Sequence, residues 1–427
     1  MIEIRHATLI TNNDNDDVVK NATLQIQEGK IVYAGSADGA PDFDAERVID
    51  ACGNAVMPGF VNTHTHVPMN LFRSYADDLD LMTWLNTKIF PAEDKLNADS
   101  AYWASMAAMC ELSAAGVTGF NDMYFFVDSI AKAAQESGLR AVLSRAVVTP
   151  APGVGERMLE ESRELFAKYN DVGRLKVYMS PHAQYTVNNE MLEKIAQEAK
   201  KLKTGVHMHI SETKGEHENC IAEQGMTPME LCEKTGLLEV PFLAAHCVWV
   251  SEHDIELMAQ HDVTVLSCPK SNLKLASGVA PLTRMLKNGV GVTIGTDGAS
   301  SNNKLSVMEE MTYATYLQKG TEYDPKAIPA ASALKLATSC GAQALGFGKG
   351  TLEAGQNADL IMLDTSGIRY TPDYDIVSLI VYAGSDSDVC MTMVGGDIVY
   401  ENGQFAFADL NEVKAKLAEY SEVMKSI

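Results

Sequence analysis

Hydrophobic positions follow two different spacings along this chain, and the change between them predicts how it is organised. Near the N-terminus, apolar and polar residues alternate over Ile2–Thr11 and Ala22–Ala34, which is typical of strands with one buried face. Short strand-like runs return near the C-terminus, at Ala358–Leu363, Val377–Tyr382 and Cys390–Val394. We therefore predict a small β-sandwich domain built from both ends of the chain, residues 1–57 and 349–406.

The middle of the chain, residues 58–348, alternates between apolar runs and patterns with the period of a helix. The strand-like runs are Val117–Asp122, Arg140–Val148, Leu175–Ser180, Val206–Ile210, Phe242–Cys247, Thr264–Cys268 and Val290–Gly295. The helical patterns include Ser100–Ala115, Asp128–Ser137, Arg157–Lys168, Glu190–Leu202 and Glu252–Gln260. With the run before His64 there are eight β units alternating with helices, which predicts an α/β fold with a TIM-like (β/α)8 barrel.

Capping residues indicate where some of these helices begin and end. Asp99–Ser100 and Asn188–Asn189 are expected N-caps, and Gly116, Gly138 and Gly205 are expected to stop helices. The tail, residues 407–427, has the pattern of a helix from Asp409 to Ile427. Its apolar positions are expected to pack either on this chain or on a neighbouring copy.

Charge and cysteine usage narrow the class of protein. The chain has 34 basic and 57 acidic residues, a net charge of −23, which excludes nucleic acid and anionic membrane surfaces as natural partners. Its eight cysteines include no Cys-X-X-Cys pair, which is typical of reduced thiols. The N-terminus has no signal-like segment, and no apolar run is long enough to span a membrane. We expect a soluble cytoplasmic protein.

The first candidate functional residues lie in Val56–His66, an apolar run that is broken at Pro58–Gly59 and ends in His64-Thr-His66. Residues two apart on a strand share a face, so both imidazoles can reach one metal ion. Alone, this pair fits two polar residues at a strand end equally well. In a barrel, however, functional groups gather at the carboxyl ends of the strands, so further candidates should follow later strands.

Four later residues meet that test. His209 ends the fifth strand, His246 the sixth and Asp297 the eighth, and Glu212 follows His209 by three residues. We predict that His64, His66, His209 and Asp297 hold one divalent ion, with zinc favoured and iron or manganese also compatible with these donors. The alternatives are a buried histidine, a helix-capping glutamate and a turn-capping aspartate.

Three further positions refine this metal site. His207 lies one pleat deeper on the same strand as His209 and is expected to be packed or hydrogen-bonded inside the barrel. Lys176 lies at the beginning of the fourth strand, on the wrong end to bridge two ions, and His182 lies at that strand's carboxyl end. We therefore expect one ion rather than two.

The same residues, His64, His66, His209, His246 and Asp297, resemble the metal-dependent amidohydrolase superfamily. More narrowly, the chain resembles the 5-methylthioadenosine/S-adenosylhomocysteine deaminases over nearly its whole length. The segments that carry this narrower likeness are Leu71–Asn86, Phe90–Glu93, His209–Glu212, Ser267–Asn272 and Gly295–Asn303.

The resemblance implies roles for residues that spacing alone does not assign. Glu93 matches the acid that grips the ribose hydroxyls, and His182 matches a histidine that contacts the nucleoside. Arg145 and Arg157 match a pair of arginines near the amino-acid tail, and a guanidinium fork suits a carboxylate there. Arg157 could instead be a solvated helix charge, and Glu93 a surface acid.

The implied reaction is hydrolytic deamination at adenine C6, which releases ammonia and the inosyl product. A metal ion would lower the pKa of a water molecule from about 16 towards about 7. Asp297 and His246 would orient that water and accept its proton, while Glu212 would donate a proton to ring N1. The cytidine-deaminase design, with its Pro-Cys-X-X-Cys ligands, is absent from this sequence.

Several alternatives stay open at this point. The same frame could act on guanine, a pterin or a triazine, although Glu93, Arg145 and Arg157 would then have no ribose or carboxylate to hold. A two-metal amide hydrolase would need a bridging group at the fourth strand, and an inactive binding protein would be expected to lack a ligand or Glu212. The preferred adenosine derivative is open, and so is assembly into a dimer or tetramer.

Overall fold

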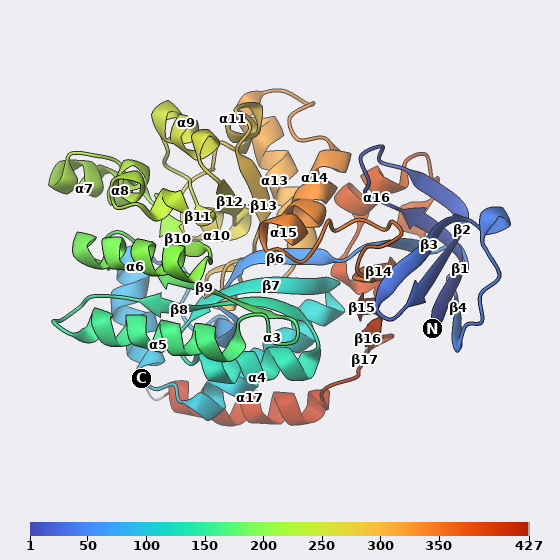
Figure 1. Cartoon of the computed structure of the whole chain (residues 1–427), viewed down its shortest axis with the longest axis horizontal. Coiled ribbons are helices and arrows are strands. Elements are labelled where there is room, and N and C mark those ends of the chain that lie inside the picture. The colour runs from blue at the N-terminus through green and yellow to red at the C-terminus, as the bar shows by residue number, and fades with distance from the viewer. Residues whose placement is uncertain (426–427) are drawn as a thin grey trace.

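The computed structural model describes residues 1–425 and contains two separate sheets (Figure 1). The larger sheet has eight parallel strands whose order in space is the order in the chain. These strands are β6 (Phe60–Thr65), β7 (Val117–Tyr124), β8 (Arg140–Val147), β9 (Leu175–Pro181), β10 (Val206–Ile210), β11 (Phe242–His246), β12 (Val263–Ser267) and β13 (Gly291–Ile294). Thr63 Oγ1 donates to the Ile294 carbonyl over 2.9 Å, so the last strand lies against the first. The predicted barrel is therefore confirmed.

Helices follow the strands and cover the outside of the barrel (Figure 1). They are α3 (Ala98–Ala114), α4 (Val127–Ser137), α5 (Val154–Tyr169), α6 (Asn189–Leu202), α7 (Lys214–Gln224), α8 (Pro228–Lys234), α9 (Glu252–Gln260), α10 (Pro269–Lys274), α11 (Leu282–Lys287), α12 (Ala299–Asn302), α13 (Val307–Glu322), α14 (Ala330–Ala337) and α15 (Ser339–Ala344). Between β6 and α3 the chain forms a 3-10 turn (Val67–Phe72), α1 (Leu81–Trp84), one π-helical turn (Leu85–Ile89) and α2 (Phe90–Glu93).

Two predicted helix boundaries are wrong. The N-cap of α3 is Asn97 rather than Asp99–Ser100, because the Asn97 side chain accepts from the Asp99 and Ser100 backbone amides. Helix α6 ends at Lys203, which itself adopts a left-handed φ of 54°, so Gly205 is not its stop. The caps predicted at Asn188 and Gly138 are confirmed.

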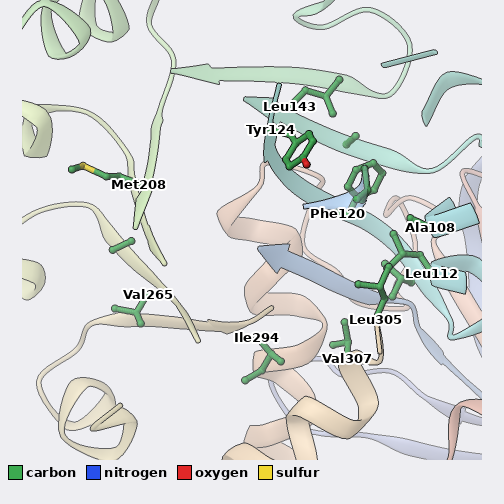
Figure 2. Packing of buried hydrophobic residues seen from close by; sticks show 14 of the residues in the cluster. Ala108, Leu112, Phe120, Tyr124, Leu143, Met208, Val265, Ile294, Leu305 and Val307 are labelled. Atoms are coloured by element: carbon green, nitrogen blue, oxygen red, sulfur yellow. The ribbon is translucent and has the colours of Figure 1, made fainter. Parts of the chain in front are cut away.

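Side chains alternate between the inside and the outside of the barrel. Phe120 of β7, Leu143 of β8 and Met208 of β10 belong to the large apolar cluster between strands and helices (Figure 2). Strand residues of the opposite alternation form a smaller cluster with the segment after α15, and its members are Val61, Val142, Leu243, Ala245, Leu266, Ala342, Leu345 and Phe347. This second cluster fills the amino-terminal end of the barrel, so the polar candidate site residues lie at the carboxyl end.

The second sheet joins both ends of the chain, as predicted, and lies beside the barrel at the right of Figure 1. Its nine strands are β1 (Ile2–Ile10), β2 (Val18–Gln27), β3 (Lys30–Ser36), β4 (Arg47–Asp50), β5 (Ala55–Pro58), β14 (Leu360–Leu363), β15 (Val389–Val394), β16 (Asp397–Glu401) and β17 (Gln404–Phe405). Strand β5 pairs with β1 on one side and with β14 on the other, which connects the N-terminal strands to the C-terminal ones.

The run Val377–Tyr382, predicted as a strand, is wrong because it forms helix α16 (Ile376–Ala383). Asp375 caps this helix by accepting from the Val377 and Ser378 amides. The run is apolar on almost every residue, and such a short run does not distinguish a buried strand from a buried helix.

Gly59 connects the two sheets, because β5 ends at Pro58 and β6 begins at Phe60. A Cβ atom on Gly59 would lie 2.1 Å from Thr118 Cγ2, so β6 and β7 approach one another closely here. The Gly59 amide donates to the Asp359 carbonyl over 3.1 Å. The first barrel strand is thereby tied to the C-terminal part of the second sheet.

The C-terminal tail forms helix α17 (Leu410–Met424), which runs along the lower edge of the barrel in Figure 1. Val413 and Met424 are buried, and the helix packs on α3 of its own chain. The last two residues of the predicted helix, 426 and 427, lie outside the described part of the chain. Within residues 1–425, none of the helices is both long and apolar enough to cross a membrane.

Candidate active site

Side chains from four strand ends converge at the carboxyl end of the barrel. His66 Nε2 lies 3.2 Å from Asp297 Oδ1 and 3.4 Å from His209 Nε2, and His64 Nε2 lies 3.6 Å from Asp297 Oδ1. Ligand atoms of His64, His66 and His209 lie within 4.8 Å of one another, and so do those of His64, His246 and Asp297. The structure therefore brings together the four predicted metal ligands and also places His246 beside them.

Hydrogen bonds from the opposite ring nitrogens to backbone carbonyls orient two of these imidazoles. His66 Nδ1 lies 2.5 Å from the Met123 carbonyl, and His209 Nδ1 lies 2.8 Å from the His182 carbonyl. A carbonyl only accepts, so each Nδ1 carries a proton and each Nε2 is the ring atom that faces the centre of the cluster. Supporting contacts of this kind are typical of metal-binding histidines.

His64 is held by a second histidine rather than by a carbonyl. Its Nδ1 lies 2.8 Å from His207 Nε2, and Asn121 Nδ2 lies 3.2 Å from His207 Nδ1. The prediction that His207 is hydrogen-bonded inside the barrel is confirmed. His64 Nε2 is fully buried and has no hydrogen-bond partner within residues 1–425. A buried nitrogen lone pair that has no hydrogen-bond partner and faces other ligand atoms suits a metal ion. This set of residues therefore fits the predicted divalent ion.

Asp297 is fixed through both of its carboxylate oxygens. Oδ2 accepts from Ser271 Oγ over 2.6 Å and from Ser301 Oγ over 2.7 Å, and Oδ1 accepts from the Gly298 amide over 2.7 Å. Burial raises the pKa of this acid, but the hydrogen bond and charge of His66 outweigh burial and hold the pKa of Asp297 well below its usual range. Asp297 is therefore ionised, as a metal-binding carboxylate has to be.

Glu212 lies on the other side of His246, and its Oε2 is 3.8 Å from His246 Nε2. Burial raises the pKa of Glu212, which favours a protonated carboxyl that can donate. His246 Nδ1 lies 2.9 Å from Asn272 Oδ1, an acceptor that leaves Nε2 free to face Glu212. The Ser211 and Glu212 amides both donate to Glu216, which fixes the turn that carries Glu212.

A cavity of about 1220 Å³ opens over these groups. His182 and Glu93 both line it, as the resemblance implied, and so does Tyr124 at the end of β7. Burial raises the pKa of Glu93 to about 7, although the neighbouring Tyr124 opposes this. Most of the remaining wall is apolar, with side chains such as Met69, Leu81, Trp84, Leu85, Phe90, Met123, Phe125, Phe126, Met158 and Leu165.

The far end of the cavity is charged. Arg145 lines it, and its Nε donates to Glu161 Oε2 over 2.9 Å. Arg157 lies on the first turn of α5 with its side chain 67% exposed and its Nε 3.7 Å from Glu161 Oε1. It is not among the described residues that line the cavity. Its predicted contact with the substrate stays a prediction, and Glu161 is the group between the two arginines.

Sequence reasoning missed several supporting residues. Ser271 and Asn272 belong to the quoted run Ser267–Asn272 but received no role, although polar residues directly after a barrel strand were a usable signal. Glu310 gave no signal at all. It is fully buried on α13 and accepts from the Lys270 amide and from Asn302 Nδ2, so it joins α10 to α12 beneath Asp297.

The profile of the amidohydrolase family matches residues 55–399, a span that includes each of these site residues. The chain belongs to the amidohydrolase family. A relative from Acetivibrio thermocellus is 41% identical over 429 residues, covers 99% of both chains, and is named 5-methylthioadenosine/S-adenosylhomocysteine deaminase. A relative of the same name from Syntrophomonas wolfei is 41% identical over 423 residues and covers 98% of both chains.

Among solved structures, an adenosine deaminase from Xanthomonas campestris with bound zinc superposes with a TM-score of 0.96. It is 30% identical and the match covers 100% of this chain and 99% of that one. The fold, the family and the resemblance to these deaminases are thus confirmed. Family membership together with the His and Asp cluster identifies a metal-dependent aminohydrolase.

Proposed function

We propose that this enzyme removes the C6 amino group from adenosine thioethers, namely 5′-methylthioadenosine and S-adenosylhomocysteine, by hydrolysis. The observation that carries the proposal is a single cavity with two chemically different ends. One end holds the cluster of His64, His66, His209 and Asp297 beside a buried acid, Glu212. The other end holds Arg145, and Glu93 lines the same cavity. These groups suit a base, a ribose and a tail.

The same four residues would hold one divalent ion, and zinc suits three imidazoles and a carboxylate. When bound, such an ion polarises a water molecule and makes it a nucleophile at neutral pH. The residues of the cluster support a single ion, because the end of β9 supplies His182, whose ring centroid lies 4.8 Å from that of His209. A bridging carboxylate is not at that position.

The protein groups then divide the proton transfers. Asp297, held as an anion, accepts a proton from the attacking water, while His246 Nε2 orients that water. Glu212, whose pKa is raised by burial, donates its proton to adenine N1 as water adds to C6. Proton return through Glu212 or Asp297 to the departing nitrogen releases ammonia.

Recognition of the rest of the substrate uses the cavity wall. Glu93 is placed to accept from the ribose hydroxyls, and the Tyr124 hydroxyl lies beside it. The thioether would contact apolar side chains such as Met158 and Phe125, which also line the cavity. A free base such as guanine or a triazine would offer Glu93 no ribose hydroxyls, and an unpaired buried polar group weakens binding.

The first test measures ammonia release by metal-loaded enzyme with S-adenosylhomocysteine, 5′-methylthioadenosine, adenosine and guanine at equal concentration. Turnover of the adenosine thioethers with weak use of guanine is expected. A Glu93→Ala variant serves as control, because it should raise KM for nucleosides more than it lowers kcat. Activity on guanine alone, or on none of the adenosine derivatives, would reject this substrate assignment and leave the family and the metal cluster unchanged.

A further inference from the structure

The charged end of the cavity already contains a carboxylate of its own. Arg145 is 12% exposed and uses its Nε to donate to Glu161 and its Nη1 to donate to the Ala146 carbonyl over 2.7 Å. Phe125 lies under the guanidinium at 5.1 Å, which fixes its plane. Glu161 thus occupies the Nε edge of the guanidinium, one of the edges that an incoming carboxylate would use.

Glu161 is also placed to contact Arg157. Its Oε1 lies 3.7 Å from Arg157 Nε, while Oε2 accepts from Arg145. Glu164 lines the same end of the cavity from the same helix, and Lys168 there is paired with Asp128 over 2.6 Å. A substrate carboxylate that enters here would therefore be repelled by Glu161 and Glu164, and the cations Arg145 and Lys168 are already paired with acids of the protein. A substrate ammonium group would not be repelled by these two acids.

We propose that Glu161 is a specificity residue that acts as a resident carboxylate, so that the enzyme favours adenosine thioethers whose 5′ tail carries no carboxylate. This inference rests on the proposed function. A methylthio tail leaves the pairing of Arg145 with Glu161 intact. The homocysteine carboxylate has to compete with Glu161 for Arg145, and the charge of Glu161 repels it.

The test compares kcat/KM of the wild-type enzyme with that of Glu161→Gln for four substrates. Two are 5′-methylthioadenosine and S-adenosylhomocysteine. The other two are adenosine thioethers whose propyl tail ends in a carboxylate alone or in an amine alone. Glu160→Gln is the matched control, because Glu160 loses the same charge one residue away but pairs with Arg163 and is 59% exposed.

In the wild type, 5′-methylthioadenosine and the amine-tailed probe should be used better than the carboxylate-tailed probe. Glu161→Gln removes one competing charge contact and should raise kcat/KM for S-adenosylhomocysteine and for the carboxylate-tailed probe up to about fivefold, with less than about a twofold change for 5′-methylthioadenosine. Glu160→Gln should change none of the four ratios. An Arg145→Ala change added to Glu161→Gln should cancel the gain, which a merely structural role of Glu161 would not predict.

The opposite result would overturn the inference. If Glu161→Gln lowers the use of S-adenosylhomocysteine and of the amine-tailed probe, Glu161 binds the ammonium of the tail instead. If all four substrates change alike, Glu161 only supports the fold. A wild-type enzyme that deaminates 5′-methylthioadenosine without these shifts rejects the inference alone, whereas one that deaminates no adenosine thioether rejects the proposed function and this inference with it.

Discussion

The two ends of the cavity are built in different ways. At the metal end, every predicted ligand is buried or nearly so, and a second group of the same chain holds it: a carbonyl for His66 and His209, a histidine for His64, and two serines for Asp297. At the tail end, Arg157 and Glu161 are partly exposed members of one helix, and their partners are other charged side chains.

This difference separates chemistry from substrate choice. The groups proposed to move protons lie at or just beyond strand ends and are fixed by contacts that one substitution disturbs strongly. The groups at the tail end are ion pairs near solvent, where a single pair contributes only about 0–1 kcal/mol. Substitutions at the metal end should therefore remove activity, whereas those at the tail end should re-rank substrates.

The largest expected effect is that of Asp297→Asn. Asparagine tolerates the left-handed φ of 62° at this position, so the fold should persist. Loss of the anion removes a metal ligand and a proton acceptor together, and kcat/KM should fall by at least ~10³-fold with a lower metal content. Ammonia release and metal analysis measure both. Full metal content with nearly normal turnover would show that Asp297 has neither role.

Glu212→Gln should come next, with kcat lowered by about 10²–10³-fold because the donor to adenine N1 is lost. Metal content should not change, since Glu212 is not one of the predicted ligands. Single-turnover ammonia release together with metal analysis separates this variant from Asp297→Asn. A loss of less than about threefold would mean that another group protonates the ring.

Asn272→Ala should lower kcat by about tenfold, because His246 then loses the acceptor that sets its orientation. Asn272→Asp keeps an acceptor at the same place and should recover most of the rate. Equal losses in the two variants would show that the amide matters for packing rather than for the hydrogen bond. Thermal unfolding of both proteins provides the control for stability.

Glu93 links the two ends and should give a pH effect of intermediate size. Burial raises the pKa of its carboxyl to about 7, so its ionised fraction falls as pH drops through neutrality. Only the ionised form accepts from both ribose hydroxyls, so KM for 5′-methylthioadenosine should rise about tenfold between pH 8 and pH 6. Glu93→Gln should raise KM and flatten this profile. An unchanged slope in that variant would assign the titration to another group.

The smallest effect is expected for Arg157→Ala. The side chain is 67% exposed, so kcat/KM for 5′-methylthioadenosine should change by less than about twofold. We would also measure kcat/KM of this variant with S-adenosylhomocysteine, to test whether the tail end contributes to binding of that substrate. A selective collapse there would mean that Arg157 swings into the cavity and pairs with the tail, as the family resemblance implies.

How much the sequence could predict follows the same division. The barrel strands were predictable because their apolar runs are bounded by helical patterns. The predicted metal ligands were found because they lie at the ends of those runs. Segment 377–382 was not, because its apolar residues would suit either a buried helix or a strand. Asn97 was missed as a cap because Asp99 and Ser100, equally good caps, follow it directly.

The tail end was harder to predict for a physical reason. Arg145 was found because it ends a strand, but the position of Arg157 depends on which way one helical turn faces and on a partner, Glu161, that no motif marks. Glu310 and its bond to Asn302 join segments that only the folded chain brings together. The spacing of residues along a chain indicates local secondary structure, but it does not indicate which side chains meet in the folded protein.

The single residue between the two sheets has a consequence for how the protein is made. Strand β5 pairs with β14, which is synthesised about 300 residues later. Gly59 joins β5 directly to β6, the strand that carries His64, so this pairing also holds β6 in place. While the ribosome is still translating the barrel, one edge of β5 therefore has no partner. Closing so long a loop is slow. His64 and His66, the first of the predicted ligands to be synthesised, thus gain the full support of both sheets only after β14 has left the ribosome.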